Sequence, residues 1–171
     1  MNTDEKKWFA AKVKHNTEKK IKTRLDEILT ENFVPFRDVV IERNGRKFRK
    51  SKPLIPSLIF VKTDSQTAMS LSAELNVTIK FLRNLDTKKL LVVPEKSMQD
   101  FMFLCDLSES AIQVENANLR QGDRVRVIKG DFAGIEGELV RIRGHKRVVV
   151  RLEGLFSLAT TYIPSAFLEK I

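Results

Sequence analysis

Cations gather on both sides of an Asn-Gly pair, where they could bind the phosphates of a nucleic acid. The pair is Asn44-Gly45, and the candidate phosphate-binding residues are Arg43, Arg46, Lys47, Arg49 and Lys50. Lysine and arginine contact phosphates without reading the base sequence. Two interpretations of this segment stay open: an arm that contacts nucleic acid, or a charged edge that prevents further strands from pairing with it.

The residue types favour binding over catalysis. The single cysteine, Cys105, and the two distant histidines, His15 and His145, form no metal-ligand cluster, and Cys105 is expected to be a small core residue on a helix. The glycine-rich segment 130–137 lacks the Gly-Lys-Ser/Thr ending that binds nucleotide phosphates. We therefore predict no enzymatic activity, no metal and no cofactor.

The positive charge is concentrated in the N-terminal part of the chain. Residues 1–104 carry 21 Lys/Arg against 13 Asp/Glu, residues 105–118 carry three acids and no base, and residues 119–171 carry 10 bases against 6 acids. A basic surface favours a polyanionic partner. The sequence has neither a signal peptide nor an apolar run of about 18 residues, so we expect a cytoplasmic protein.

The elements that would position the basic arm belong to an α+β domain. The Asn-Gly pair predicts a type I′ hairpin, because both central positions of that turn need positive φ. Alternation with a period of two predicts strands around it, and apolar residues at helical spacing predict helices. We expect one antiparallel sheet covered by helices. The predicted order begins with strand 8–13 and a helix capped by Asn16 or Thr17, whose apolar face contains Ile21, Leu25, Ile28 and Leu29. The hairpin arms 33–43 and 46–52 follow, and then strand 53–61. The remaining elements are a helix capped by Ser65, strands 77–81 and 89–93, and a helix from Pro94.

The C-terminal residues predict a small antiparallel barrel. Between residues 121 and 152, valine and isoleucine alternate with arginine as in half-buried strands, and Gly130-Asp131 and Gly144-His145 are expected to form tight turns. The preceding residues, 106–118, lose apolar periodicity and indicate a linker. We therefore predict an N-terminal domain at 1–105, a linker at 106–118 and a barrel domain at 119–171.

Motifs along most of the chain resemble a known family. The run 122–127 followed by 130–137 resembles the KOW motif of SH3-like barrels in transcription elongation factors and ribosomal proteins. A basic α+β domain, a linker and a KOW barrel together are similar to the NusG family of transcription elongation factors. The resemblance includes Lys7-Trp8-Phe9, the basic hairpin and segment 55–61, in which Ile55, Ser57 and Leu58 replace the family's aromatic residue, glycine and tyrosine. With these departures, the chain resembles a specialised paralogue of the family. It is most similar to the antiterminators of polysaccharide operons in Bacteroides-type bacteria.

The resemblance implies a monomeric factor that binds RNA polymerase and suppresses pausing or termination. The five candidate phosphate-binding cations of the hairpin would lie near upstream or non-template DNA. Residues 66–72, as a loop, would contact the side of the polymerase cleft opposite the clamp. An apolar pocket would dock on the clamp of the large polymerase subunit through Trp8, Phe9, Lys12, Ile55, Leu58 and Phe60. The barrel would bind a small-subunit ribosomal protein or the termination factor Rho through Phe132, Ile135 and Phe156.

Three alternatives stay open. Phe156 could instead plug the end of the barrel, and the glycines and valines of the KOW segment could serve barrel architecture alone. A ribosome-associated KOW protein that binds structured RNA is the competing function, although the acidic linker and the modest charge of the barrel speak against it. Since valine and glycine both disfavour helix, we expect a stable barrel rather than the helical hairpin that some family members form.

Overall fold

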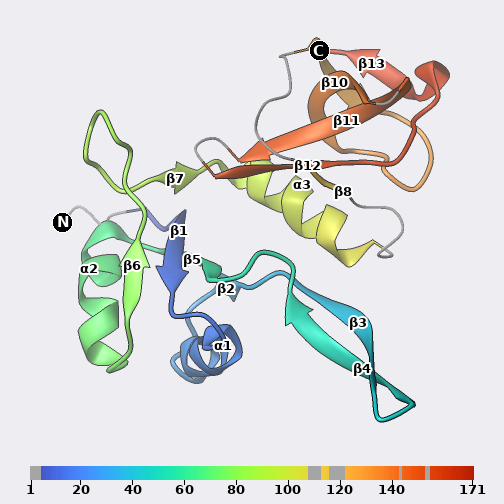
Figure 1. The fold of residues 1–171 in the computed structure, drawn as a ribbon. Helices are drawn as coiled ribbons and strands as arrows, with labels where there is room; N and C mark the ends of the chain where they lie inside the picture. The colour runs from blue at the N-terminus through green and yellow to red at the C-terminus, as the bar shows by residue number, and fades with distance from the viewer. Residues whose placement is uncertain (1–4, 108–112, 116–121, 143, 153–154) are drawn as a thin grey trace. The chain divides into compact units, whose positions relative to one another are not determined.

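The computed structural model describes residues 5–107, 113–115, 122–142, 144–152 and 155–171 (Figure 1). The chain divides into two compact units, Met1–Pro94 and Glu95–Ile171. The predicted domain boundaries stay a prediction, and residues 108–112 and 116–121, most of the expected linker, lie outside the described residues. No helix within the described ranges is long and apolar enough to cross a membrane.

The first unit is built on an antiparallel sheet with the order β2-β5-β1-β6, in which β7 also pairs with β1. Its central strands, β1 and β5, are apolar at successive positions and are buried on both faces, as expected for the middle of a sheet. The strands are β1 (Lys7–Val13), β2 (Asn32–Phe33), β5 (Leu58–Thr63), β6 (Ile79–Phe81) and β7 (Val92–Val93).

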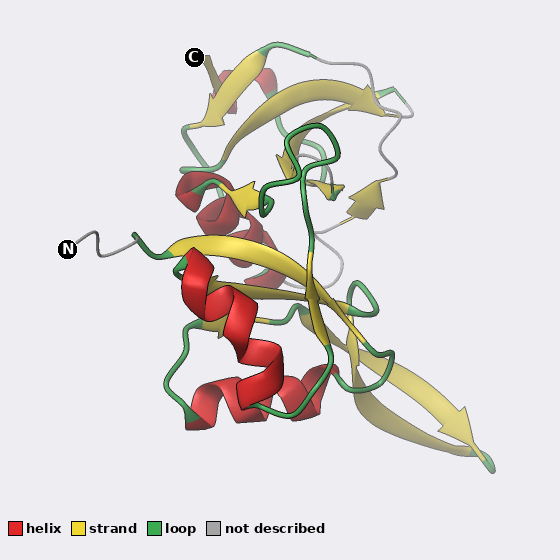
Figure 2. Ribbon diagram, turned by 90° about the vertical axis from the view of Figure 1, so that its left-hand side faces the viewer, coloured by secondary structure: helices red, strands yellow, loops and turns green. Residues whose placement is uncertain are grey.

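Two helices of this unit, α1 (Glu18–Glu27) and α2 (Ser65–Glu74), pack against one face of the sheet (Figure 2). The core between them contains Ile21 and Leu25 of α1 and Leu71 of α2. The expected α+β arrangement of helices on an antiparallel sheet is therefore confirmed for this unit.

Two details of the helix predictions are wrong. Ile28 and Leu29 do not extend the apolar face, because α1 ends at Glu27 and Leu29 turns outward with a φ of 54°. The cap of α2 is Asp64 rather than Ser65, since the Asp64 carboxylate accepts a hydrogen bond from the Thr67 backbone N–H.

The predicted hairpin is confirmed as a separate two-stranded sheet of β3 (Phe36–Arg43) and β4 (Arg46–Pro53), whose arms extend away from α1 in Figure 1. Asn44 and Gly45 both have positive φ, 53° and 71°, as a type I′ turn requires. The first arm was expected to begin at residue 33, but residues 34 and 35 separate β2 from β3. Likewise, the strand expected from residue 53 begins at Leu58, because a turn occupies residues 54–57.

The second unit contains α3 (Glu95–Asp106) and a six-stranded antiparallel sheet ordered β13-β9-β10-β11-β12-β8. The alternating valines and arginines do form strands, but β13 and β8 are the ends of the described sheet and do not pair, so a closed barrel is not shown. Gly130-Asp131 is not a two-residue turn either, since residues 128–135 connect β9 to β10. The strands are β8 (Gln113–Glu115), β9 (Arg124–Val127), β10 (Glu136–Ile142), β11 (His145–Leu152), β12 (Phe156–Ala159) and β13 (Leu168–Lys170), with a 3-10 turn at Ser165–Phe167 before β13.

Candidate functional site

The pairing of β1 with β5 brings most of the predicted polymerase-binding residues onto one face of the sheet. Residues that lie directly opposite each other in an antiparallel pair point to the same side. The α1 and α2 core takes the alternate residues, such as Ala11 and Ile59. The remaining face, called here the β1–β5 face, consists of the opposed pairs Trp8 and Lys62, Ala10 and Phe60, and Lys12 and Leu58.

The β1–β5 face combines a large apolar centre with cations at its margin. Trp8, Leu58 and Phe60 are almost completely buried, whereas Lys12 is exposed. The ammonium group of Lys62 lies 5.7 Å from the centre of the Trp8 ring, within the range of a cation–π contact. The indole Nε1 of Trp8 has no hydrogen-bond partner among the described residues. A buried donor of this kind is rare and calls for an explanation.

Two predicted polymerase-binding residues lie elsewhere. Phe9 alternates with Trp8 and points to the opposite side of the sheet, where its ring meets the edge of Phe81 with 6.2 Å between ring centres. Ile55 lies half-buried in the turn before β5. Residues 66–72, expected in a loop, form part of α2 instead, where Met69 is exposed.

The turn before β5 is held in place by a buried carboxylate. Ser57 has a φ of 64°, the left-handed region that glycine adopts most easily. Its N–H donates to Glu18 Oε1 at 2.8 Å, and its carbonyl accepts from the Val13 N–H at 3.0 Å. Glu18 is only 2% exposed, so this bond forms away from bulk water. Ser57 therefore has a glycine-like backbone at the end of this turn.

The hairpin separates its charges onto two faces. Opposed residues of β3 and β4 share a face, and successive pairs alternate. One side, the mixed face, carries Asp38, Val40, Glu42, Lys47 and Arg49, with Phe36, Ser51 and Pro53 at its base. The other side, the basic face, carries no acid and contains Arg37, Arg43, Arg46, Lys50 and Lys52 around Val39, Ile41 and Phe48.

This separation divides the five cations predicted to lie near nucleic acid. Arg43, Arg46 and Lys50 lie on the basic face, but Lys47 and Arg49 share the other face with two carboxylates. The sequence analysis missed two members of the basic face, Arg37 and Lys52, although counting outward from the Asn-Gly turn would have found them. It also missed Phe48, which is 49% exposed among these cations.

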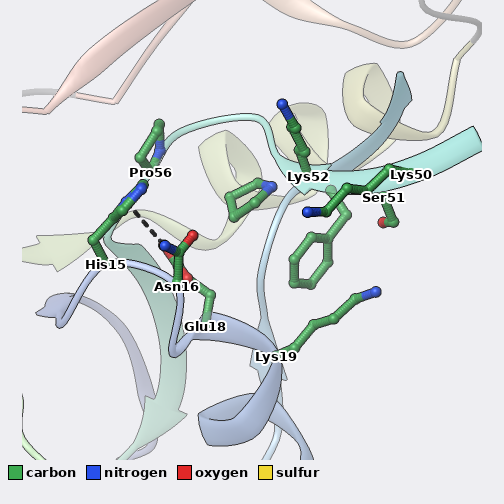
Figure 3. A pocket seen from close by; sticks show the side chains of 10 residues that line it. His15, Asn16, Glu18, Lys19, Lys50, Ser51, Lys52 and Pro56 are labelled. Atoms are coloured by element: carbon green, nitrogen blue, oxygen red, sulfur yellow. Dashed lines mark ion pairs between the residues drawn. The ribbon is translucent and has the colours of Figure 1, made fainter. Parts of the chain in front are cut away.

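A cavity of about 590 Å³ opens at the base of the hairpin (Figure 3). Its walls come from the residues before α1, the first turn of α1, both hairpin strands and the turn before β5. We call it the lysine cavity, and it is lined by His15, Asn16, Glu18, Lys19, Phe36, Lys50, Ser51, Lys52, Pro53 and Pro56.

The second unit has a smaller cavity with an aromatic wall. It measures about 240 Å³ and is lined in part by Phe132, Tyr162 and Phe167. Of the predicted partner-binding residues, Phe132 is thus at a surface cavity, whereas Ile135 is only 1% exposed and lies in the core. Phe156 begins β12, and its side chain lies outside the described part of the structure.

A buried carboxylate on α3 joins this helix to the sheet of its own unit. Asp100 Oδ2 accepts from the Glu136 N–H at 3.2 Å, and Oδ1 lies 2.5 Å from the ammonium group of Lys96. Lys96 also donates to the carbonyl of Gly134 at 2.9 Å. Nearby, the hydrogen bond from Arg126 lowers the pKa of the Glu136 carboxyl below its ordinary value.

The described residues offer little for catalysis. Cys105 is partly buried on α3, and this burial raises its pKa to about 12, so its thiol stays protonated and weakly nucleophilic near neutral pH. Among the described side chains, no group of three or more His, Cys, Asp or Glu could hold a metal ion. The prominent exposed features are therefore the basic face of the hairpin and two cavities, whereas the apolar residues of the β1–β5 face are buried.

Comparisons with known proteins place the chain in a family. A comparison with curated proteins finds no match. Among solved structures, the chain is similar to one described as "Domain interaction in Thermotoga maritima NusG", with 20% sequence identity, a TM-score of 0.49 and 98% of each chain covered. The profile of the NusG family, described as "Transcription termination factor nusG", matches residues 6–102. Because this match spans more than half of the 171 residues, the chain belongs to the NusG family.

Proposed function

We propose that the protein is a transcription elongation and antitermination factor that binds RNA polymerase through its first unit. Proteins of the NusG family are transcription factors that generally interact with RNA polymerase. The observation that carries the proposal is the match of residues 6–102 to the NusG family, within which the β1–β5 face gathers Trp8, Leu58 and Phe60 beside the exposed Lys12. Because these three apolar side chains are buried in the structure, docking would require that they become exposed. Large apolar side chains surrounded by charged ones are typical of protein interfaces.

The proposed mechanism contains no chemical step. Docking of the β1–β5 face on the clamp of the large polymerase subunit would stabilise the closed enzyme and disfavour the open states that precede pausing and termination. A partner group could also accept a hydrogen bond from Trp8 Nε1, which has no acceptor among the described residues. Pairing such a donor removes a cost of about 1–3 kcal/mol.

The basic face of the hairpin is proposed to lie against upstream or non-template DNA. Its five cations are not accompanied by any acid on the same face. Phe48 adds an exposed ring, and cations interleaved with aromatic rings favour single-stranded nucleic acid, whose bases can stack on them. The mixed face, with its two carboxylates, is expected to contribute little.

The second unit is proposed to be a KOW domain that recruits a small-subunit ribosomal protein or Rho. The aromatic cavity that includes Phe132 offers a surface for such a partner. Phe156 remains a candidate for the same role, whereas Ile135, which is buried, would not contact a partner directly. The substitutions at Ile55, Ser57 and Leu58 further suggest a paralogue that serves particular operons, such as those for surface polysaccharides.

Binding to an assembled bacterial elongation complex tests the proposed function. Lys12→Glu places a negative charge at the margin of the β1–β5 face without touching its core, so we expect a loss of affinity of about tenfold or more. Lys20→Glu, on an exposed position of α1 outside this face, makes the same charge change and should bind as the wild type does.

Two results would contradict the proposal. Equal binding by the Lys12→Glu and Lys20→Glu variants would exclude the β1–β5 face as the docking surface. Failure of the wild type to bind polymerase, together with tight binding to ribosomal RNA, would favour the ribosome-associated alternative.

A further inference from the structure

The lysine cavity combines an apolar floor with cations that have no acidic partner in the described part of the chain. Phe36, Pro53 and Pro56 supply the apolar surface. The ammonium group of Lys19 lies 5.8 Å from the centre of the Phe36 ring, and Lys50 and Lys52 line the cavity from the hairpin strand β4 (Figure 3). Among the described residues, no carboxylate forms an ion pair with any of these three lysines.

The one acid of the cavity is already engaged. Glu18 accepts the hydrogen bond from the Ser57 N–H, and its other neighbour is His15, with 4.0 Å between Glu18 Oε1 and His15 Nδ1. The dashed line in Figure 3 marks this pair. The negative charge of Glu18 is therefore held at one end of the cavity, and the three ammonium groups keep the rest of it positive.

These walls fit a ligand that is both planar and anionic. An aromatic ring and two prolines offer flat apolar surface to a base, and lysines bind phosphate as point charges. A volume of about 590 Å³ is within the usual range for a small-ligand site. A base paired within a duplex is stacked on both sides and would not enter such a site.

We propose that the lysine cavity binds one unpaired nucleotide, with its base against Phe36 and its phosphate among Lys19, Lys50 and Lys52. This inference rests on the proposed function, in which the hairpin lies beside DNA. Lys50 and Lys52 belong to the basic face, whereas Phe36 and Pro53 belong to the mixed face, so the cavity at the base of the hairpin is lined from both faces. A single strand lying on the basic face would have to pass around the hairpin edge to place a base against Phe36, and the cavity would then select unpaired over paired DNA.

The test uses the full-length protein without polymerase. The probe is a single-stranded DNA of about 12 nucleotides, within the usual site size, that contains 2-aminopurine. We expect binding to change the 2-aminopurine fluorescence and to shift the backbone amide NMR signals of His15, Asn16, Ser51 and Lys52. A duplex of the same sequence should bind more weakly and leave these signals in place.

Two kinds of variant locate the base and the phosphate. Phe36→Leu keeps an apolar side chain but removes the ring, so single-strand affinity should fall about tenfold, as expected for one stacked base. Lys19→Ala should weaken binding more than Lys20→Ala, which removes the same charge from a neighbouring residue outside the cavity. Since Phe36 also packs against the core of its unit, the lysine pair and the amide shifts provide a test that does not depend on it.

The remaining arms distinguish the sources of the ligand. If thymidine monophosphate displaces the single-stranded probe at a concentration similar to that at which unlabelled single-stranded DNA does, the nucleotide site is supported and a free nucleotide is its ligand. The proposal is overturned if inorganic phosphate competes as well as the mononucleotide, if Phe36→Leu and Lys19→Ala bind as Lys20→Ala does, or if the amide shifts lie outside the cavity. Binding of Phe36→Leu to polymerase lacking nucleic acid should equal that of the wild type, so failure of the cavity and failure of polymerase docking give different results.

Discussion

At the scale of single residues, Glu18 determines the conformation of a turn 39 positions away in the sequence. It is buried and accepts the Ser57 N–H, which fixes the left-handed backbone that precedes β5. The resemblance to the family implied that Ser57 replaces a glycine, but nothing in the sequence indicated that a glutamate would hold the resulting backbone. Contacts between residues so far apart depend on packing that local periodicity does not encode.

Removal of this carboxylate should destabilise the protein. Glu18→Ala leaves the Ser57 N–H buried without an acceptor, so we expect the free energy of unfolding to fall by about 2 kcal/mol, measured by urea titration. Glu18→Gln retains an acceptor oxygen and should lose less. Glu27→Ala, at the exposed end of the same helix, is the control and should change little. Equal effects of Glu18→Ala and Glu27→Ala would show that the bond to Ser57 contributes nothing.

A second residue-scale effect should depend on pH. The hydrogen bonds that Asp64 accepts from the backbone N–H and the hydroxyl of Thr67 lower its pKa below the ordinary value of 3.8. The folded protein therefore binds this proton more weakly than the unfolded chain does. Stability from Asp64 is complete above the ordinary pKa and is lost as the pH falls through the lower folded pKa.

The substitution that reveals this dependence is Asp64→Ala. We expect a loss of about 1 kcal/mol at pH 7, typical of a removed helix cap, and a smaller loss under acid conditions, measured by urea unfolding at a series of pH values. Asp64→Asn keeps a capping oxygen but does not titrate, so it should retain most of the stability at pH 7. A constant difference between Asp64→Ala and the wild type at every pH would contradict this account.

At the scale of secondary-structure elements, the two helices of the first unit end in the same way with different residues. In both, the residue after the C-cap has positive φ: Leu29 after α1 and Asn76 after α2. The N–H of Thr30 donates a hydrogen bond to the carbonyl of Leu25, and the N–H of Val77 donates one to the carbonyl of Ser72. This is the pattern of a Schellman motif. Ile28 and Leu29 fit the apolar spacing of α1, so the sequence favoured a longer helix. Leucine rarely adopts positive φ, so it gave no signal that the helix ends before it.

Leu29→Gly should therefore stabilise the protein. Leu29 is 93% exposed, so little burial is lost, and glycine removes a steric cost of about 1–2 kcal/mol for the left-handed backbone. Part of this gain is offset by the greater freedom of glycine in the unfolded chain, so we expect a net increase of about 1 kcal/mol in urea unfolding. Asn76→Gly is the matched control and should gain less, because asparagine tolerates this conformation. A loss of stability in Leu29→Gly would mean that the exposed leucine makes a favourable contact.

The hairpin shows how far an element can be predicted from its turn. The Asn-Gly signal located the turn and both arms, and the register that follows from it assigns each cation to a face. The sequence analysis treated the cations as one group, so it combined Lys47 and Arg49 with Arg43 and Arg46. Charge counting along a segment does not distinguish the two faces of a strand, whereas alternation does.

The two faces should differ in their effect on nucleic-acid binding. Arg43→Ala combined with Arg46→Ala removes two cations from the basic face, so affinity for single-stranded DNA should fall and the slope of log K against log salt should decrease by about 1.4, for two lost phosphate contacts. Lys47→Ala combined with Arg49→Ala removes the same charge from the mixed face and should have a smaller effect on both quantities. Identical salt slopes for the two double variants would support the alternative in which the hairpin is only a solubilising edge.

At the scale of the whole molecule, the sequence predicted the types of helix and sheet better than it predicted where elements and domains begin and end. The antiparallel sheet, the helices on its face and the valine-rich strands of the second unit are all present, since alternation and helical periodicity are local signals. The β1–β5 face was also largely predicted, with Trp8, Lys12, Leu58 and Phe60 together. Phe9 was assigned to it by proximity in sequence, although neighbours in a strand point to opposite sides.

The last helix shows why domain limits are harder to predict. Residues 6–102 match the NusG family, and this range contains all of α3 except its final turn. The contacts of α3 nevertheless place it in the second unit. The link is Asp100, whose carboxylate holds the Glu136 N–H and pairs with Lys96. The apolar pattern of a helix does not show which acidic residue lies on its buried side. The hydrogen bond between Asp100 and the Glu136 N–H could therefore not be predicted from the sequence.

Asp100→Ala should loosen α3 from the sheet of its own unit. The substitution leaves the Glu136 N–H without its acceptor and removes the partner of Lys96, so we expect a loss of about 2 kcal/mol in the free energy of unfolding. Hydrogen exchange at the Glu136 amide should become faster by more than the global loss alone explains. Asp100→Asn keeps an acceptor and should preserve part of this protection, whereas Asp106→Ala, at the exposed end of α3, should leave it unchanged. Unchanged exchange at Glu136 in Asp100→Ala would show that the Asp100 carboxylate does not hold α3 on this sheet and that the apolar residues of the helix suffice.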